Sequence, residues 1–177
     1  MPAALSAAIG TALVSMVANY TTGNPAYKIC QDKVADILVK TENYRCQLEA
    51  LVDEDVNAYS KLSDGIKVSG SDKNKLEVLY KEALVPPFET CKIAAACLRL
   101  CKTMAECGNK KLITDVAVAA ILLEGAFFSA KFNVYINLKY IKDMDYVGKV
   151  HGVLADLEKE LPALKEEILE MCEEVIE

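Results

Sequence analysis

The chain has 177 residues and a net charge of −6; hydrophobic residues make up 53% of it and tryptophan is absent. This length suits one domain with a sizeable core, and the high apolar fraction argues against intrinsic disorder. The acidic balance argues against nucleic-acid binding, because such proteins need a basic face to displace counterions. Leu, Ala, Lys, Glu and Val dominate the sequence, so residues 1–177 are predicted to form a single helical domain.

The first 27 residues carry no charged side chain before Lys28. A secretory signal would begin with basic residues and end at a cleavage site, and neither is present. The apolar part, Ala3 to Ala18, has 16 residues, fewer than the ~20 that a membrane span needs. We therefore expect a buried helix from about Pro2 to Asn19 and no role at a membrane. The residues Thr22-Gly23-Asn24-Pro25 should end this helix.

A heptad-like stripe, with spacings of three and four residues, runs from Tyr27 to Leu62. It predicts an amphipathic helix about 55 Å long. The stripe is mostly apolar but includes Asp55. The following segment, Ser63 to Asp72, is polar and contains two glycines, so it is predicted to be a loop.

The remaining sequence predicts further helices separated by proline and glycine. One should cover Lys73 to Leu84, and a second should begin at Pro86-Pro87 and end near Cys107, because proline suits the first helical turn. Another should run from Thr114 to Ile141, and the last from Asp145 to Glu177, with a kink or break at Pro162. No segment reads as a strand. The sequence thus predicts an all-α, antiparallel up-and-down bundle of about five to six helices, several of them long.

The seven cysteines form no CxxC pair, and the single histidine, His151, is distant from them in the sequence. Zinc normally takes four closely organised Cys and His ligands, so we expect no metal site. The cysteines are predicted to be reduced thiols within the core of a cytoplasmic protein, and His151 is expected on the surface.

Two aspartates stand out against the apolar helical pattern. Asp55 lies in the otherwise apolar stripe, where it either acts as a general acid or base or is ion-paired or exposed to water. Asp115 lies at the head of the most apolar helix, where it is either an ordinary capping residue or part of a site.

Asn133 and Asn137 are four residues apart and therefore share a helix face. Asp115 precedes Asn133 by five helical turns and points the same way, with mostly small residues between them. This face either binds a flat heterocycle or forms hydrogen bonds to neighbouring helices. Asp115 and Asn133 are about 27 Å apart along one helix, so one ligand could not touch both within a single subunit. A two-fold partner could bring the opposite ends together, which indicates a site at a subunit interface.

Three segments carry a family resemblance: Ala3 to Thr22, Leu51 to Tyr59, and Gly108 to Asp143. The first is a small-residue helix ending in M-V-A-N-x-T, and the third ends in N-V-x-I-N-L-x-x-I-K-D. Together they resemble the cyclodeaminase domain of formiminotransferase-cyclodeaminase and its stand-alone relatives, including methenyltetrahydrofolate cyclohydrolases. The sequence departs from the family pattern in two places. Where the family has the motif S-D-x-G, this sequence has Thr114-Asp115-Val116-Ala117, and where the family commonly has a basic residue, this sequence has Tyr135.

The resemblance implies a helical homodimer with folate bound near the subunit interface, no cofactor, and a tetrahydrofolate derivative as substrate. It implies that Asp55 and Asp115 are catalytic, dividing the roles of acid and base. It also implies a set of substrate-binding residues, consisting of Asn19, Thr22, Asn133, Asn137, Lys139 and Lys142.

The expected activity is that of a formimidoyltetrahydrofolate cyclodeaminase or a methenyltetrahydrofolate cyclohydrolase. Family members usually carry a glycine-rich P-G-G-G-S stretch before the small-residue helix, whereas this sequence starts at Met1-Pro2, where that stretch would end. Either the start is truncated or the loop is lost. The alternative is a catalytically silent homodimer that binds folate or a protein.

Overall fold

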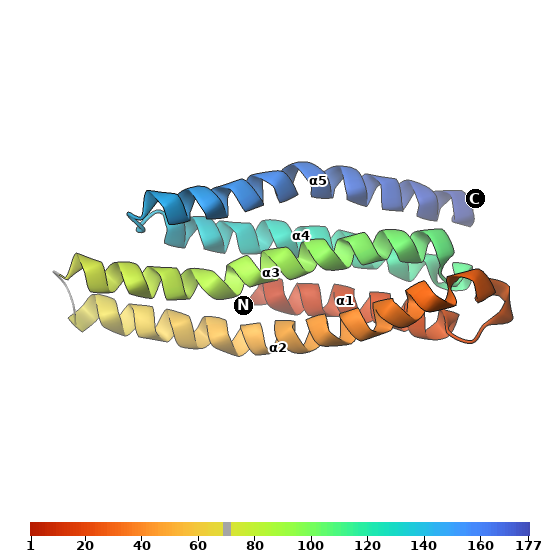
Figure 1. The fold of residues 1–177 in the computed structure, drawn as a ribbon, viewed down its shortest axis with the longest axis horizontal. Coiled ribbons are helices and arrows are strands. Elements are labelled where there is room, and N and C mark those ends of the chain that lie inside the picture. Colours follow the sequence, from red (N-terminus) through yellow and green to blue (C-terminus); the bar gives the residue numbers. More distant parts are fainter. Residues whose placement is uncertain (69–71) are drawn as a thin grey trace.

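The computed structural model describes residues 1–68 and 72–177. In this part of the chain, five long helices run along a common axis and reverse direction one after the other (Figure 1). There is no strand among the described residues, so the all-α bundle prediction is confirmed. The helices are α1 (Pro2–Thr21), α2 (Gln31–Val68), α3 (Lys73–Cys107), α4 (Ile113–Leu138) and α5 (Met144–Ile176), with short 3-10 helices η1 (Pro25–Cys30) and η2 (Lys110–Leu112).

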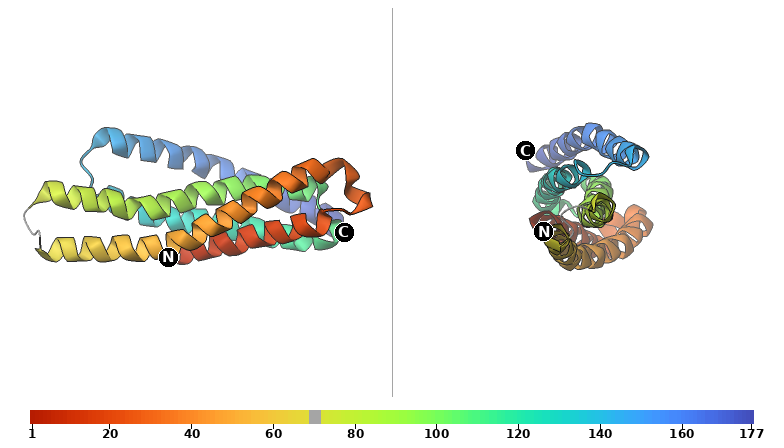
Figure 2. Two further views of the ribbon diagram at one scale, coloured as in Figure 1. Left: turned by 60° about the horizontal axis from the view of Figure 1, so that its bottom comes forward. Right: turned by 90° about the vertical axis from the view of Figure 1, so that its left-hand side faces the viewer.

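Helix α3 is the central element, because it contacts each of the other four long helices. The end-on view in Figure 2 shows α1 and α4 side by side on one side of the bundle. Small residues allow these two helices to approach closely. A Cβ atom on Gly10 would lie only 2.8 Å from Cγ of Leu123.

The predicted helix break at Pro86-Pro87 is wrong. The two helices expected around Pro86-Pro87 are one continuous helix, α3, with both prolines buried inside it. A proline removes the backbone donor for the carbonyl four residues earlier, and a helix survives when another group satisfies that carbonyl. Here the side chain of Asn137 donates to the carbonyl of Ala83. Helix α5 also continues through Pro162, so of the two predicted alternatives there the break is wrong and the kink stays a prediction.

The predicted loop from Ser63 to Asp72 is also wrong over its first half, because α2 continues to Val68. Gly65 lies where a Cβ atom would clash with the side chain of Leu79, so this glycine lets α2 and α3 pack closely. Residues 69–71 lie outside the described part, and Asp72 caps α3 by accepting a hydrogen bond from the backbone N–H of Lys75 (3.2 Å).

All seven cysteines are free thiols. Four are buried as predicted, whereas Cys46 is exposed and two others are half-buried. Burial raises the pKa of Cys91 to about 12 and that of Cys97 to about 11, so these thiols are neutral near pH 7. His151 is exposed, as predicted.

Two segments are long and apolar enough to cross a membrane by length and composition alone, namely Pro2–Thr21 and Lys110–Leu138. Each packs one side into the bundle and leaves apolar side chains on the other. We call this exposed surface the α1–α4 face; its large apolar residues are Leu5 (58% exposed), Ile9 (49%), Val118 (47%), Ile121 (52%), Phe132 (69%) and Ile136 (55%).

Candidate functional site

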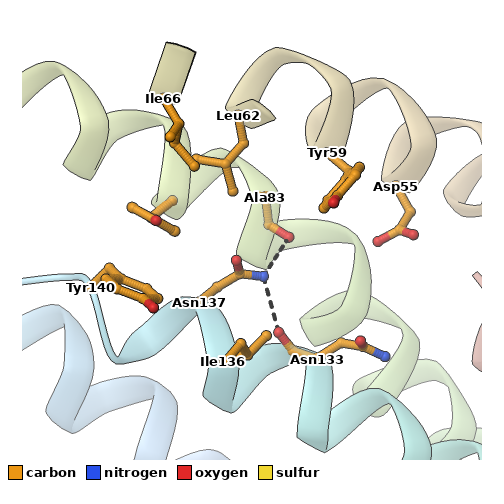
Figure 3. Close-up of a pocket in the computed structure, with 10 residues that line it drawn as sticks. Asp55, Tyr59, Leu62, Ile66, Ala83, Asn133, Ile136, Asn137 and Tyr140 are labelled. Atoms are coloured by element: carbon orange, nitrogen blue, oxygen red, sulfur yellow. Dashed lines mark hydrogen bonds between the residues drawn. The ribbon is translucent and has the colours of Figure 1, made fainter. Parts of the chain in front are cut away.

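A cavity of about 320 Å³ lies between α2, α3 and the C-terminal end of α4 (Figure 3). Three of the residues singled out in the sequence, Asp55, Asn133 and Asn137, line this cavity. Its other walls are apolar or aromatic and include Tyr59, Leu62, Ile66, Tyr80, Ala83, Ile136 and Tyr140. The folded chain therefore gathers polar side chains that are far apart in sequence into one hollow.

Asp55 reaches the cavity from the middle of α2 and is half-buried, with 29% of its side chain exposed. One carboxylate oxygen lies 3.8 Å from the amino group of Met1, so the start of α1 lies beside the cavity. Asp55 is itself part of the cavity wall. Its position on the cavity wall leaves its oxygens available to a bound molecule as well.

The two asparagines project from the last turns of α4. The side-chain amide of Asn137 donates to the carbonyl oxygens of Ala83 (3.2 Å) and Asn133 (3.0 Å). The side-chain amide of Asn133 donates to the carbonyl of Ser129 (3.2 Å). Asn137 therefore both bonds to the neighbouring helix and lines the cavity.

Aromatic side chains close one end of the cavity. The rings of Tyr80 and Tyr140 stack with centroids 4.5 Å apart and planes at 15°, and burial raises the pKa of Tyr80. The ammonium group of Lys139 lies 5.9 Å from the centroid of the Tyr140 ring, which places it near the cavity rim. Sequence reasoning missed Tyr80 and Tyr140, because residues sixty positions apart show no shared pattern.

The loop after Tyr140 is held against α3 by Asp143. Its carboxylate accepts a hydrogen bond from Lys81 (2.8 Å) and from the backbone N–H of Tyr146 (3.1 Å), and its own backbone N–H donates to Glu77 (3.0 Å). The Lys81 ammonium group is the main reason that the pKa of Asp143 is lowered. These bonds fix the segment that carries Tyr140.

The other predicted site residues lie elsewhere. Asn19, Thr22 and Asp115 are at the opposite end of the bundle, where the C-terminal end of α1 meets the start of α4 (Figure 1). Lys142 is exposed and does not line the cavity. The chain thus brings together three of the eight predicted residues, with Lys139 near them, and leaves Asp115 at a distance.

At this second end, Asn19 is exposed in a shallow groove that includes Arg45. The hydroxyl of Thr22 donates to the carbonyl of Ala18 (3.1 Å). Asp115 is half-buried in the first turn of α4, and the residue at the capping position is Leu112, which makes no side-chain capping bond. Asp115 is therefore not the capping residue of this helix.

The fold and the cavity define a helical bundle with a largely apolar and aromatic hollow between helices that carries a few polar groups, a kind of site that bundles use for small molecules. Within residues 1–68 and 72–177, no group of three or more His, Cys, Asp or Glu side chains is arranged to hold a metal ion.

Comparison with known proteins agrees with this class. The model of the family described as formiminotransferase-cyclodeaminase matches residues 2–156. The methenyltetrahydrofolate cyclohydrolase of Methylorubrum extorquens is 31% identical over 175 residues, which cover 95% of this chain and 84% of that protein. The formimidoyltransferase-cyclodeaminase of Mus musculus is 29% identical over 89% of this chain but only 30% of its own length.

A solved structure shows the same fold. The formiminotetrahydrofolate cyclodeaminase of Thermotoga maritima superposes with a TM-score of 0.91 at 27% identity, covering 99% of this chain and 87% of that one. The chain belongs to the formiminotransferase-cyclodeaminase family.

Proposed function

We propose that this protein is a folate enzyme acting on the one-carbon unit of tetrahydrofolate, as a formimidoyltetrahydrofolate cyclodeaminase or a methenyltetrahydrofolate cyclohydrolase. The observation that carries the proposal is the cavity, because it unites Asp55, Asn133 and Asn137 with a stacked tyrosine pair. Carboxylate and amide groups facing aromatic rings suit a flat, hydrogen-bonding heterocycle such as a pterin. Relatives with both enzyme names support either activity.

We further propose that the working form is a homodimer joined through the α1–α4 face. This face exposes six large apolar side chains, an arrangement that marks an interaction surface. Asp115 and Asn133 are equidistant from residue 124, so a two-fold axis crossing α4 near that point would place the partner's Asp115 over Asn133. At the neighbouring Gly125 a Cβ atom would meet no heavy atom within 4 Å, which leaves room for a partner helix.

In such a dimer, each cavity gains a second carboxylate from the partner. For the cyclodeaminase reaction, the aniline nitrogen attacks the formimino carbon on the pterin nitrogen, and ammonia leaves as the ring closes. One carboxylate accepts the proton of the attacking N–H, and the other protonates the leaving amine. We assign these roles to Asp55 of one subunit and the partner subunit's Asp115, in either order.

For the cyclohydrolase reaction, water adds to the cationic methenyl carbon and loses a proton, which gives a tetrahedral intermediate still bonded to both nitrogens. One of the two C–N bonds then breaks as the C=O bond forms, and the released nitrogen takes up the hydroxyl proton, which yields the formyl product. One carboxylate accepts that proton and stabilises the cation. Because the electrophile already carries a positive charge, we propose that neither a metal nor a cofactor takes part. The ammonium group of Lys139 near the cavity rim, together with that of Lys142, is proposed to meet the carboxylates of the folate tail. Asn19 and Thr22 lie at the opposite end of the bundle from the cavity, so they are proposed to contact the substrate bound in the other subunit's cavity.

The reduced cysteines and the folate chemistry together support a cytoplasmic location, and we propose that residues 1–177 act as one helical unit.

The purified chain tests this function with two substrates. With 5,10-methenyltetrahydrofolate, a cyclohydrolase accelerates the loss of methenyl absorbance above the rate in buffer. With 5-formiminotetrahydrofolate, a cyclodeaminase produces that absorbance together with an equal amount of ammonia. We expect turnover of at least one substrate. If the protein binds tetrahydrofolate but turns over neither, it is the silent folate-binding alternative; if it neither binds nor turns over any of them, the proposal fails.

A further inference from the structure

The carbonyl of Ala83 has no donor in its own helix. In an α-helix this oxygen would accept a hydrogen bond from the N–H of residue 87, and in a 3-10 turn from that of residue 86. Both positions are proline, which has no N–H. The ring of Pro87 also clashes with the carbonyl of residue 83 in an ideal helix and turns it outward. Ala83 is buried, so its carbonyl needs a partner from elsewhere.

Asn137 supplies this partner from α4. Its side-chain nitrogen lies 3.2 Å from the Ala83 oxygen and 3.0 Å from the Asn133 oxygen (Figure 3). Both acceptors are carbonyl groups, and only the NH₂ end of an amide can donate to them. The two bonds therefore use both amide hydrogens and fix which end of the amide is nitrogen.

The oxygen of this amide then has only one role left. Asn137 lines the cavity, and with its NH₂ group committed it can only accept a hydrogen bond from a bound molecule. Asp55 in the same cavity, when ionised, is also an acceptor. These two residues therefore call for a ligand that carries N–H or O–H groups at matching positions.

We propose that Pro87 is a positioning residue. Because it has no N–H to donate to the carbonyl of Ala83, that carbonyl binds the NH₂ group of Asn137 instead. This bond locks the orientation of the Asn137 amide, so that its oxygen is free to accept a hydrogen bond from an N–H group of the ligand. The choice of ligand class rests on the proposed folate function: the ligand is a 2-amino-4-oxopterin, whose 2-amino group and ring N–H are hydrogen-bond donors along one edge. Asn137 accepts from that edge and rejects rings that present an acceptor there, because two facing acceptors leave both unpaired.

The lock is tested without any folate by the Asn137 side-chain NH₂ signals in ¹⁵N–¹H spectra, assigned by their loss in Asn137→Ala. In Pro87→Ala, the new N–H at position 87 takes the Ala83 carbonyl, so exchange of the Asn137 amide protons with solvent should accelerate about fivefold or more. Pro86→Ala is the matched control, because Pro87 still withholds the helical donor from Ala83 and the exchange rate stays near that of the wild type. Unchanged exchange in Pro87→Ala would overturn the proposal.

The consequence for substrate is tested by steady-state kinetics with the folate that the protein turns over. Pro87→Ala should raise KM about fivefold, the effect of one neutral hydrogen bond, with kcat nearly unchanged. In an Asn137→Ala background the same proline change should have no further effect on KM, since it acts through Asn137. Additive effects in this cycle would show a general structural role and contradict the proposal. If the wild-type protein turns over no folate, the proposed function fails, while the exchange measurement still decides whether Pro87 locks the amide.

Discussion

Replacing Asp115 by asparagine is expected to lower kcat about 10²–10⁴-fold, the range for loss of a positioned acid or base. Asparagine keeps the size of the side chain and its hydrogen-bonding oxygen but cannot exchange a proton near neutral pH. Helix α4 has Leu112 at its capping position and no side-chain capping bond, so the substitution of Asp115 removes no capping interaction and should cost little stability. Initial rates with methenyltetrahydrofolate and formiminotetrahydrofolate measure the effect.

Asp145→Asn is the matched control for this substitution. Asp145 also lies in the first turn of a long helix, α5, so both changes remove one negative charge that favours the helix dipole. Only Asp115 lies on α4, one of the two helices that form the α1–α4 face. Equal kcat values for Asp115→Asn, Asp145→Asn and the wild type would show that Asp115 has no part in the chemistry.

Ile121→Glu is expected to give a folded monomer with turnover reduced about as strongly as in Asp115→Asn. Ile121 is 52% exposed at the centre of the α1–α4 face, so a carboxylate there costs the single subunit little. In the proposed dimer the same carboxylate would be buried near its symmetry mate, where an unpaired charge costs several kcal/mol. Sedimentation or light scattering reports the mass, and circular dichroism reports the fold.

Val153→Glu provides the comparison, because Val153 is 40% exposed on α5, away from the α1–α4 face. It should leave both mass and turnover at the wild-type values. Two outcomes would exclude the α1–α4 face as a functional interface: an Ile121→Glu protein that remains a dimer, or one that is monomeric and fully active.

The helical architecture was predictable because apolar side chains repeat at intervals of three and four residues along most of the chain. The errors arose where a partner distant in sequence overrides a local rule. Pro86-Pro87 reads as a break, yet α3 continues because Asn137, more than fifty residues later, donates to Ala83. Gly65 predicts a loop when the sequence is considered locally. In the fold it lies within α2, where the absence of a side chain leaves room for Leu79.

The candidate site was predictable only in part. Asp55 and the two asparagines are visible as polar residues on apolar helical faces, and the cavity unites them. Tyr80 and Tyr140 do not stand out in the sequence, because tyrosine is common on amphipathic helices. Only the tertiary fold brings their two rings together. The separation of Asp115 from Asn133 along α4 could be calculated from helix geometry. Because one ligand cannot reach both residues within one subunit, the proposed site includes a partner subunit.

A heterodimer built from two inactive variants tests the shared site most directly. One chain carries Asp55→Asn and the other Asp115→Asn, with different affinity tags so that only mixed dimers are purified. If each site combines Asp55 of one subunit with the partner subunit's Asp115, one of the two sites regains both carboxylates, and the mixed dimer should show about half of the wild-type turnover. A mixed dimer as inactive as its two parents would contradict a site shared between subunits.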